Sequence, residues 1–271
     1  RAMEIVHEKD QLKNFVEEAF KAAEENPILI DKFIDHAMEI DVDAVSDGKK
    51  VEVAGIMQHI EEAGIHSGDS ACCLPPVSIK KELIKEIENQ TKKLALALKV
   101  KGFMNIQFAI KNDEIYVIEV NPRASRTVPF VSKAKGIPYA KIASRVMAGE
   151  KLSKFNLVSK TKKMFAVKEA VFPFNKFPNS DLLLGPEMKS TGEVMGFDKD
   201  FGMAFAKSQI AASNSLPTKG LAFISLKDSH KPEGIDLAKQ LLKLGFKLCA
   251  TKGTAEFIRQ NKIKCRTINK V

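Results

Sequence analysis

The sequence predicts an α/β protein in two parts, a mixed α+β portion followed by a shorter, incomplete unit built around a parallel sheet. In the first part, stretches that alternate between polar and apolar residues stand beside segments with helical periodicity. After about residue 214 the chain reads strand, helix, strand, helix, strand, an order that favours parallel pairing. Its 271 residues are 44% apolar and 28% charged, which suits a folded protein with a packed core.

Composition narrows the class of partner. No run of about 18 apolar residues occurs, so no membrane span is expected. The net charge is +9, but the lysines are scattered, Trp is absent and only two Tyr occur, which favours phosphorylated small ligands over nucleic acid. The chain begins Arg-Ala-Met-Glu without a signal-peptide pattern, and this start suggests a fragment of a longer protein.

The four cysteines carry little signal. Cys249 and Cys265 are isolated, and no Cys-x-x-Cys spacing occurs, so a zinc site is not expected. The vicinal pair Cys72–Cys73 has a redox-active interpretation, but reduced thiols in a cytoplasmic protein are favoured over it.

The first elements are a helix, a short buried strand and a hairpin. Residues 11–24 have one apolar face, and Asn26–Pro27 follows, where a helix would end. Residues 28–34 form an apolar run that predicts a buried strand. The hairpin consists of residues 38–45 and 51–57, and one face of its first strand is acidic, a pattern usual for the solvated side of a sheet. The acidic residues are Glu39, Asp41 and Asp43.

The middle of the chain alternates loops with regular elements. Residues 59–70 are rich in Gly, Ser and Asp and predict a loop. Ser78 is the expected N-cap of a long helix over 79–99, and Pro138 the expected first turn of a helix that ends near Gly149. The remaining expectations are a strand over 164–174, a loop-rich stretch over 183–196 in which Glu187 and Glu193 are structural, and a linker over 212–220.

A second hairpin, within residues 104–121, carries the strongest chemical signal. A turn centred on Asp113 sets Gln107 opposite Glu119, and directly opposed side chains have Cβ atoms roughly 4.5–5.5 Å apart. With Asn121 they offer three oxygen ligands to a hard cation, and Arg123 and Arg126 follow at once. Mg²⁺ beside guanidinium groups is the combination that phosphoryl transfer uses, although a surface hairpin with ordinary polar residues has the same pattern.

The final unit predicts strands over 221–226, 246–250 and 263–269, as in Rossmann-like folds. The turn Thr251-Lys252-Gly253-Thr254 follows the second of these strands and opens a helix, where backbone amides and the helix dipole favour a phosphate. A Thr-x-Gly-Thr turn is a weak signal by itself.

Long strings then resemble one family. IEVNPRASRTVPFVSKAKGIPYAKIA, GIMQHIEEAGIHSGDSACCLPP and LLGPEMKSTGEVMG closely resemble the second ATP-grasp unit of the carbamoyl phosphate synthetase large-subunit family. Biotin-dependent carboxylases share the Glu-x-Asn-x-Arg pattern, but Gln-Val-Glu-His would then be expected where this chain reads Ser-Arg-Thr-Val-Pro. The Thr-x-Gly-Thr turn resembles the methylglyoxal-synthase-like regulatory domain of the same subunit.

The resemblance implies roles for individual residues. For phosphoryl transfer it implies Asn121, Arg123 and Arg126. For ATP it implies Lys32, Ile34, Glu39, Gly64, Ile65, His66, Ser67, Gln107 and Glu119, with Lys32 departing from a histidine found in some members. For Mg²⁺ or Mn²⁺ it implies Gln107, Glu119 and Asn121. For the phosphate of a nucleotide effector it implies Lys231, Thr251, Thr254 and Lys270. His59 and Glu61 correspond to positions near a monovalent cation, which makes K⁺ a further candidate.

The resemblance also implies an organisation and an activity. Residues 1–149 would be the C-terminal part of an ATP-grasp domain, 150–214 its closing segment and linker, and 215–271 the start of the regulatory domain. The intact family enzyme phosphorylates carbamate with ATP for pyrimidine and arginine biosynthesis, is paired with a glutaminase small subunit and is expected to be oligomeric, whereas this fragment alone should be a poor catalyst. Two alternatives are another ATP-grasp carboxylate–amine ligase and a non-catalytic nucleotide-binding regulatory fragment.

Overall fold

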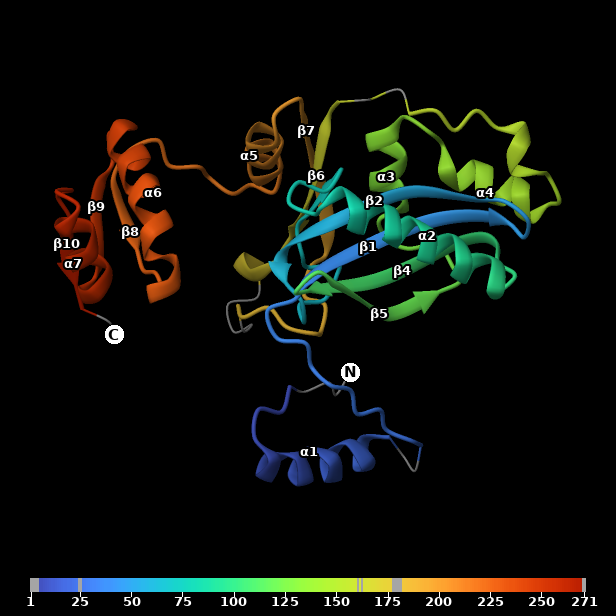
Figure 1. The fold of residues 1–271 in the computed structure, drawn as a ribbon, viewed down its shortest axis with the longest axis horizontal. Helices are drawn as coiled ribbons and strands as arrows, with labels where there is room; N and C mark the ends of the chain where they lie inside the picture. Colours follow the sequence, from blue (N-terminus) through green and yellow to red (C-terminus); the bar gives the residue numbers. More distant parts are fainter. Residues whose placement is uncertain (1–4, 24–25, 160, 162, 177–181, 270–271) are drawn as a thin grey trace. The chain divides into compact units, whose positions relative to one another are not determined.

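The computed structural model describes residues 5–23, 26–159, 161, 163–176 and 182–269 and divides the chain into two compact units, Arg1–Asn214 and Ser215–Val271. The division falls inside the stretch 212–220. Figure 1 shows the elements of each unit. Among the described residues, no helix is both long enough and apolar enough to span a bilayer.

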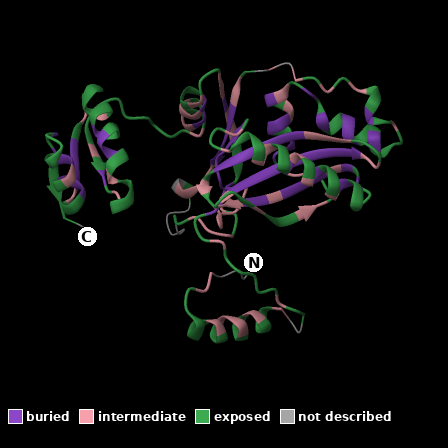
Figure 2. Ribbon diagram, viewed as in Figure 1, coloured by how far each residue is buried: buried purple, intermediate pink, exposed green. Residues whose placement is uncertain are grey.

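The first unit is built on a seven-stranded antiparallel sheet in the order β5-β4-β1-β2-β3-β6-β7. Its strands are β1 Met38–Asp47, β2 Val51–Glu62, β3 Cys72–Leu74, β4 Lys101–Lys111, β5 Glu114–Asn121, β6 Phe165–Val171 and β7 Gly192–Asp198. β1 pairs with β2 on one side and with β4 on the other, so its backbone is hydrogen-bonded along both edges. Figure 2 shows these central strands as the most buried part of this unit.

Helices cover both faces of this sheet. The helices of the first unit are α1 Lys9–Ala22, α2 Lys81–Ala97, α3 Val128–Lys135, α4 Tyr139–Met147 and α5 Phe201–Ala211, with short 3₁₀ turns at Leu152–Lys154 and Phe174–Lys176. Ile87 of α2 packs with Ile40 and Val42 of β1 in one core. Val45, from the opposite face of β1, packs with residues of α3 and α4 in another. The acidic residues of β1 therefore lie on the α3–α4 face.

The second unit confirms the predicted parallel sheet. Its strands are β8 Leu221–Ile224, β9 Lys247–Thr251 and β10 Arg266–Ile268, in the order β10-β9-β8, and both pairings are parallel. The helices are α6 Lys231–Lys243 and α7 Lys252–Gln260, preceded by a 3₁₀ turn at Asp228–His230. Ala238, Ala250 and Ile258 are central to a core that the two helices and the sheet share. The mixed α/β fold class is thus confirmed in both units.

Several local predictions are wrong. Residues 28–34 form no strand; Leu29 and Ile30 are 84% and 61% exposed, because no neighbouring strand pairs with this run in the described chain. β2 continues to Glu62, so the predicted loop over 59–70 begins only at Ala63. Ser78 is not the N-cap of α2: Lys80 holds that position without a side-chain cap, while the Ser78 Oγ accepts a 2.6 Å hydrogen bond from Gln58 Nε2.

Two further expectations need correction. The acidic face of β1 is buried, with Glu39, Asp41 and Asp43 only 5%, 2% and 0% exposed, because loops and helices of the same unit cover it. The stretch 183–196 was expected to be loop-rich, yet β7 begins at Gly192 and pairs along the whole of β6. The helices α3 and α5 had no sequence expectation.

Cys72 and Cys73 lie on β3 and are fully buried. Burial raises the pKa of Cys73 to about 11 and raises the pKa of Cys72 further. Thiols that remain protonated are poor nucleophiles, which supports the interpretation as reduced structural cysteines over a redox pair.

The packing of α5 on β7 predicts a specific sensitivity. The Cβ of an alanine at Gly196 would collide with the Ala204 carbonyl and lie 2.5 Å from Ser208 N, both on the backbone of α5. Gly196→Ala should therefore lower the free energy of unfolding by about 2–3 kcal/mol in urea titrations. Gly192→Ala on the same strand is the matched control, because its Cβ would meet only Val171 at 4.0 Å. Equal stability of the two variants would contradict this packing.

Candidate active site

The β4–β5 hairpin brings the predicted metal ligands together. Gln107 lies directly opposite Glu119, as predicted, but for a different reason. The turn is centred between Asn112 and Asp113, which both have positive φ, and that centring alone would place Ile118 opposite Gln107. A β-bulge shifts the register between Gln107 and Phe108, and the extra residue on β5 restores the Gln107–Glu119 pair.

The donor set fits a hard cation. Asn121 lies opposite Asn105, two pairs along from Gln107–Glu119, so its side chain projects from the same face of β5 as Glu119. The Gln107 amide donates a 3.3 Å hydrogen bond to Ser67 Oγ, which leaves its carbonyl oxygen available as a ligand. One carboxylate and two amide oxygens suit Mg²⁺ when phosphates supply further ligands. In the described part of the chain no cluster of three or more His, Cys, Asp or Glu has metal-binding geometry.

Of the residues predicted to bind ATP, Gly64 lies beside Glu39. The Glu39 carboxylate accepts a backbone hydrogen bond from Gly64 and lies 3.9 Å from His59 Nδ1. Burial raises the pKa of Glu39, and His59 opposes that shift. Gly64 has φ +104°, and a Cβ there would lie 3.1 Å from the Phe33 ring, so glycine lets this aromatic residue approach the loop. Of the predicted hinge residues beside Phe33, Lys32 is exposed and Ile34 is half-buried.

The loop Ala63–Ala71 carries Ile65, His66 and Ser67, all half-buried. Burial lowers the pKa of His66, so its ring is neutral near pH 7, and its Nδ1 accepts a 3.0 Å hydrogen bond from Gly68 N. A second segment holds the loop from the other side, because Asp69 accepts hydrogen bonds of 2.8 and 2.9 Å from Lys189 N and Ser190 N.

Sequence reasoning missed Lys168. It is 1% exposed in the centre of β6, and its Nζ donates a 2.9 Å hydrogen bond to the Ser67 carbonyl oxygen. A lysine side chain is thus buried beside the loop Ala63–Ala71. The available signal was the charged pair Lys168-Glu169 inside the otherwise apolar run 164–174. Charged side chains in such a run are rarely buried without a specific partner.

The two arginines lie in the segment that follows β5. Arg123 and Arg126 are both exposed, and Arg126 contacts Met188 of the 183–191 segment. Burial raises the pKa of Glu193, and the positive charges of Lys168, Lys133 and Arg126 oppose that shift. Glu193, which had only a structural interpretation from sequence, therefore belongs electrostatically to this cationic region.

Glu169 of β6 and Glu61 of β2 form an acidic pair. Burial, followed by the charge of Glu61, raises the pKa of Glu169 to about 7, while the amide of Gln209 on α5 donates a 2.5 Å hydrogen bond to it. Glu61 itself accepts a 2.7 Å hydrogen bond from Ala71 N. His59 Nε2 lies 3.1 Å from Asp41 Oδ2, and its Nδ1 has no hydrogen-bond partner among the described residues.

In the second unit, three of the four predicted effector residues line one cavity of about 340 Å³. Lys231 Nζ lies 2.6 Å from Asp228 Oδ1, and Thr251 Oγ1 is 3.3 Å from Thr254 Oγ1. The cavity opens at the N-terminus of α7, where an anion is stabilised. The fourth predicted residue, Lys270, lies outside the described residues.

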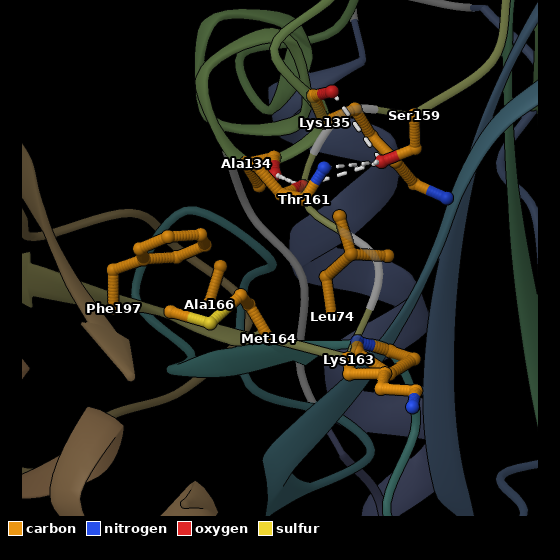
Figure 3. Close-up of a pocket in the computed structure, with 10 residues that line it drawn as sticks. Leu74, Ala134, Lys135, Ser159, Thr161, Lys163, Met164, Ala166 and Phe197 are labelled. Carbon is orange, nitrogen blue, oxygen red and sulfur yellow. Dashed lines mark hydrogen bonds between the residues drawn. The ribbon is translucent and has the colours of Figure 1, made fainter. Parts of the chain in front are cut away.

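Another cavity, of about 150 Å³, lies beside β3 and α3 and contains none of the predicted site residues (Figure 3). Its hydroxyl groups are already engaged: Ser159 Oγ donates to the Lys135 carbonyl at 3.4 Å, and Thr161 Oγ1 donates to the Ala134 carbonyl.

Two solved structures share this fold. The biotin carboxylase domain of a single-chain bacterial carboxylase matches with a TM-score of 0.51 at 18% identity, over 63% of this chain and 38% of that one. Rhizobium etli pyruvate carboxylase, with the allosteric activator acetyl coenzyme A, matches with a TM-score of 0.53 at 16% identity, over 64% and 16%. The antiparallel sheet and its helices thus have the ATP-grasp fold.

The family within this class follows from sequence. The family model described as "Carbamoyl-phosphate synthase L chain, ATP binding domain" matches residues 1–155, and the model described as "MGS-like domain" matches residues 233–271. The chain belongs to the carbamoyl-phosphate synthase L chain ATP-binding domain family, which confirms the resemblance of its motifs.

Curated relatives match along the whole chain. The "Carbamoyl phosphate synthase large chain, C-terminal section" of Aquifex aeolicus is 51% identical over all of this chain and 54% of its own length. The large chain of Pseudomonas putida is 56% identical over 25% of its length, and that of Archaeoglobus fulgidus 55% over 25%. The chain therefore spans between a quarter and about half of these relatives.

The acidic pair predicts a pH dependence of stability. Because the pKa of Glu169 rises from 4.5 to about 7 on folding, its contribution to stability is full below pH 4.5 and is lost as the pH rises through 7. Glu169→Gln should therefore gain about 2 kcal/mol relative to the parent protein between pH 5 and pH 8. Denaturant titrations at both pH values measure the difference, with Glu82→Gln on the exposed face of α2 as control. Parallel pH profiles for parent and Glu169→Gln would contradict the shift.

Proposed function

We propose that this chain contributes the nucleotide- and metal-binding part of an ATP-dependent carbamate kinase step, carbamate plus ATP giving carbamoyl phosphate plus ADP. The observation that carries the proposal is the Gln107–Glu119 pair, with Asn121 and two arginines directly after it. Membership of the family, whose model description names an ATP-binding domain, supports ATP as the phosphoryl donor. The names of the curated relatives support carbamoyl phosphate as the product.

Each group has a distinct role in this proposal. Glu39 accepts hydrogen bonds from the ribose hydroxyls, and the backbone of the Gly64–Ser67 loop lies along the nucleotide. Arg123, with Arg126, neutralises charge on the transferred phosphoryl group and holds the carbamate oxygen in line for attack. Positioning and electrostatic stabilisation are most of what phosphoryl transfer requires, so no side-chain nucleophile is needed.

Gln107, Glu119 and Asn121 would hold Mg²⁺ or Mn²⁺, which when bound reduces the negative charge of the ATP phosphates. Glu119 supplies the carboxylate of this set. Ser67 orients Gln107 through the 3.3 Å hydrogen bond and so couples the loop to the hairpin. K⁺ is proposed near His59 and Glu61. There the buried His59 Nδ1 lies 3.9 Å from Glu39 and has no hydrogen-bond partner in the described part of the chain, which is compatible with a further polar ligand.

In the whole protein, we propose a glutaminase small subunit as ammonia donor, an oligomeric assembly, a cytoplasmic location and roles in pyrimidine and arginine biosynthesis.

The second unit is proposed to bind a nucleotide effector through Lys231, Thr251 and Thr254. The proposed boundaries remain 1–149, 150–214 and 215–271, and the 271 residues alone are proposed to be a poor catalyst. Another ATP-grasp carboxylate–amine ligase is the alternative, and a panel of carboxylate substrates assayed for ADP release separates the two.

The metal role predicts a loss of phosphoryl transfer. In the full-length protein, Glu119→Ala should reduce ATP formation from carbamoyl phosphate and ADP by at least about 100-fold, because the divalent cation loses its carboxylate ligand. Glu114→Ala, at the exposed start of the same strand, is the matched control. A rate for Glu119→Ala within about twofold of the parent would rule out this role.

The effector role predicts ligand-dependent stabilisation of the second unit. Thermal-shift measurements with UMP, IMP and ATP should show stabilisation by at least one nucleotide, and Thr254→Ala should remove it. Thr218→Ala in the exposed linker is the control. Stabilisation that survives in Thr254→Ala would place the nucleotide elsewhere.

A further inference from the structure

Asp43 has no role in the proposed chemistry, yet it is the most completely buried carboxylate of the acidic row. Its side chain is 0% exposed in the middle of β1, directly opposite Asn105 on β4. Both of its oxygens accept hydrogen bonds. Oδ1 accepts from Ser125 Oγ at 2.6 Å and from Asn105 Nδ2 at 3.0 Å, and Oδ2 accepts from Thr127 Oγ1 at 2.6 Å.

The two hydroxyls belong to the segment that carries the arginines. Along residues 123–127, exposed Arg123 and Arg126 alternate with half-buried Ser125 and buried Thr127. The guanidinium groups therefore face solvent while the hydroxyls between and after them face the sheet. Ser125 and Thr127 are 82 and 84 positions from Asp43 in sequence. Their hydrogen bonds therefore connect this segment to a strand at the centre of the sheet that is distant along the chain.

The donors are neutral, and each hydroxyl has a single proton. Ser125 Oγ and Thr127 Oγ1 are also 2.7 Å apart. Because each hydroxyl donates its single proton to the carboxylate, no hydrogen bond forms between the two hydroxyls themselves. Burial raises the pKa of Asp43 to about 6 and the Ser125, Thr127 and Asn105 hydrogen bonds oppose that shift, so near pH 7 the group is a carboxylate and accepts both hydroxyls. Hydrogen bonds to a buried charge are among the stronger ones in proteins.

We infer that Asp43, Ser125 and Thr127 form a clamp that positions Arg123 and Arg126 over the transferred phosphoryl group. Asp43 touches no reacting atom in this arrangement and acts as a positioning residue through the two hydroxyls. The inference rests on the proposed function for the role of the arginines, but the clamp itself is a property of the fold and has its own test.

The first test does not depend on catalysis. Trypsin cleaves after arginine, and cleavage at Arg123 or Arg126 requires the segment to open locally. In the 271-residue chain, Ser125→Ala/Thr127→Ala should be cut at these two positions at least about tenfold faster than the parent, with the sites identified by mass spectrometry. The single variant Thr127→Ser keeps both hydroxyls and should resist trypsin as well as the parent does. Ser144→Ala on the exposed face of α4 is the matched control.

The second test uses the full-length protein. The double variant should lower kcat for ATP formation from carbamoyl phosphate and ADP by at least about tenfold, while KM for MgADP changes less than about threefold, because the nucleoside contacts lie elsewhere. Parent-like trypsin cleavage of the double variant would overturn the clamp. Faster cleavage with unchanged kcat would overturn the positioning role.

The two proposals fail separately. If the parent protein forms no ATP from carbamoyl phosphate, the proposed function fails, whereas the proteolysis result still decides whether the clamp exists. Variants at the two hydroxyls keep the test available even where Asp43→Ala fails to fold, because Ser125→Ala and Thr127→Ala leave the Asp43 carboxylate and its hydrogen bond from Asn105 in place.

Discussion

The burial of charge on one face of β1 is the constraint on which the first unit depends. β1 is paired along both edges, and loops and helices of the same unit cover the face to which its odd-numbered side chains point. A buried carboxylate is costly unless donors reach it. Here the donors come from distant segments: Gly64 reaches Glu39, His59 reaches Asp41, and Ser125 and Thr127 reach Asp43. Satisfying this acidic row therefore fixes the surrounding loops over the sheet.

The loop Ala63–Ala71 shows how this constraint builds a site. The Ser67 carbonyl oxygen accepts a hydrogen bond from the Lys168 ammonium group, and the Ser67 hydroxyl accepts one from the Gln107 amide. The Asp69 carboxylate accepts a hydrogen bond from Lys189 N in the 183–191 segment. One loop thus joins the β4–β5 hairpin to β6 and to the segment that contacts Arg126. The positions of the proposed metal ligands, of Lys168 and of Arg126 are consequently linked through a small set of contacts.

The second unit forms its cavity of about 340 Å³ from different elements. Strand β9 ends at Thr251 and helix α7 starts at the next residue, so the turn presents backbone amides at a helix N-terminus without any buried carboxylate. Lys231 contributes from α6, although Asp228 already engages its ammonium group. An anionic ligand in this cavity would compete with Asp228 for that lysine.

The sequence by itself determined the family, the division into two parts, and most strands and helices, and it supplied the residues that we propose for the nucleotide and the metal. The strands and helices follow from local alternation and turn residues, and the family follows from the long motif strings. Only the tertiary structure decided that the acidic face of β1 is buried, that residues 28–34 have no strand partner, and that a bulge rather than the turn sets Gln107 against Glu119. The physical reason is common to all three: burial, strand pairing and bulges depend on neighbours distant in sequence, and no local pattern specifies them.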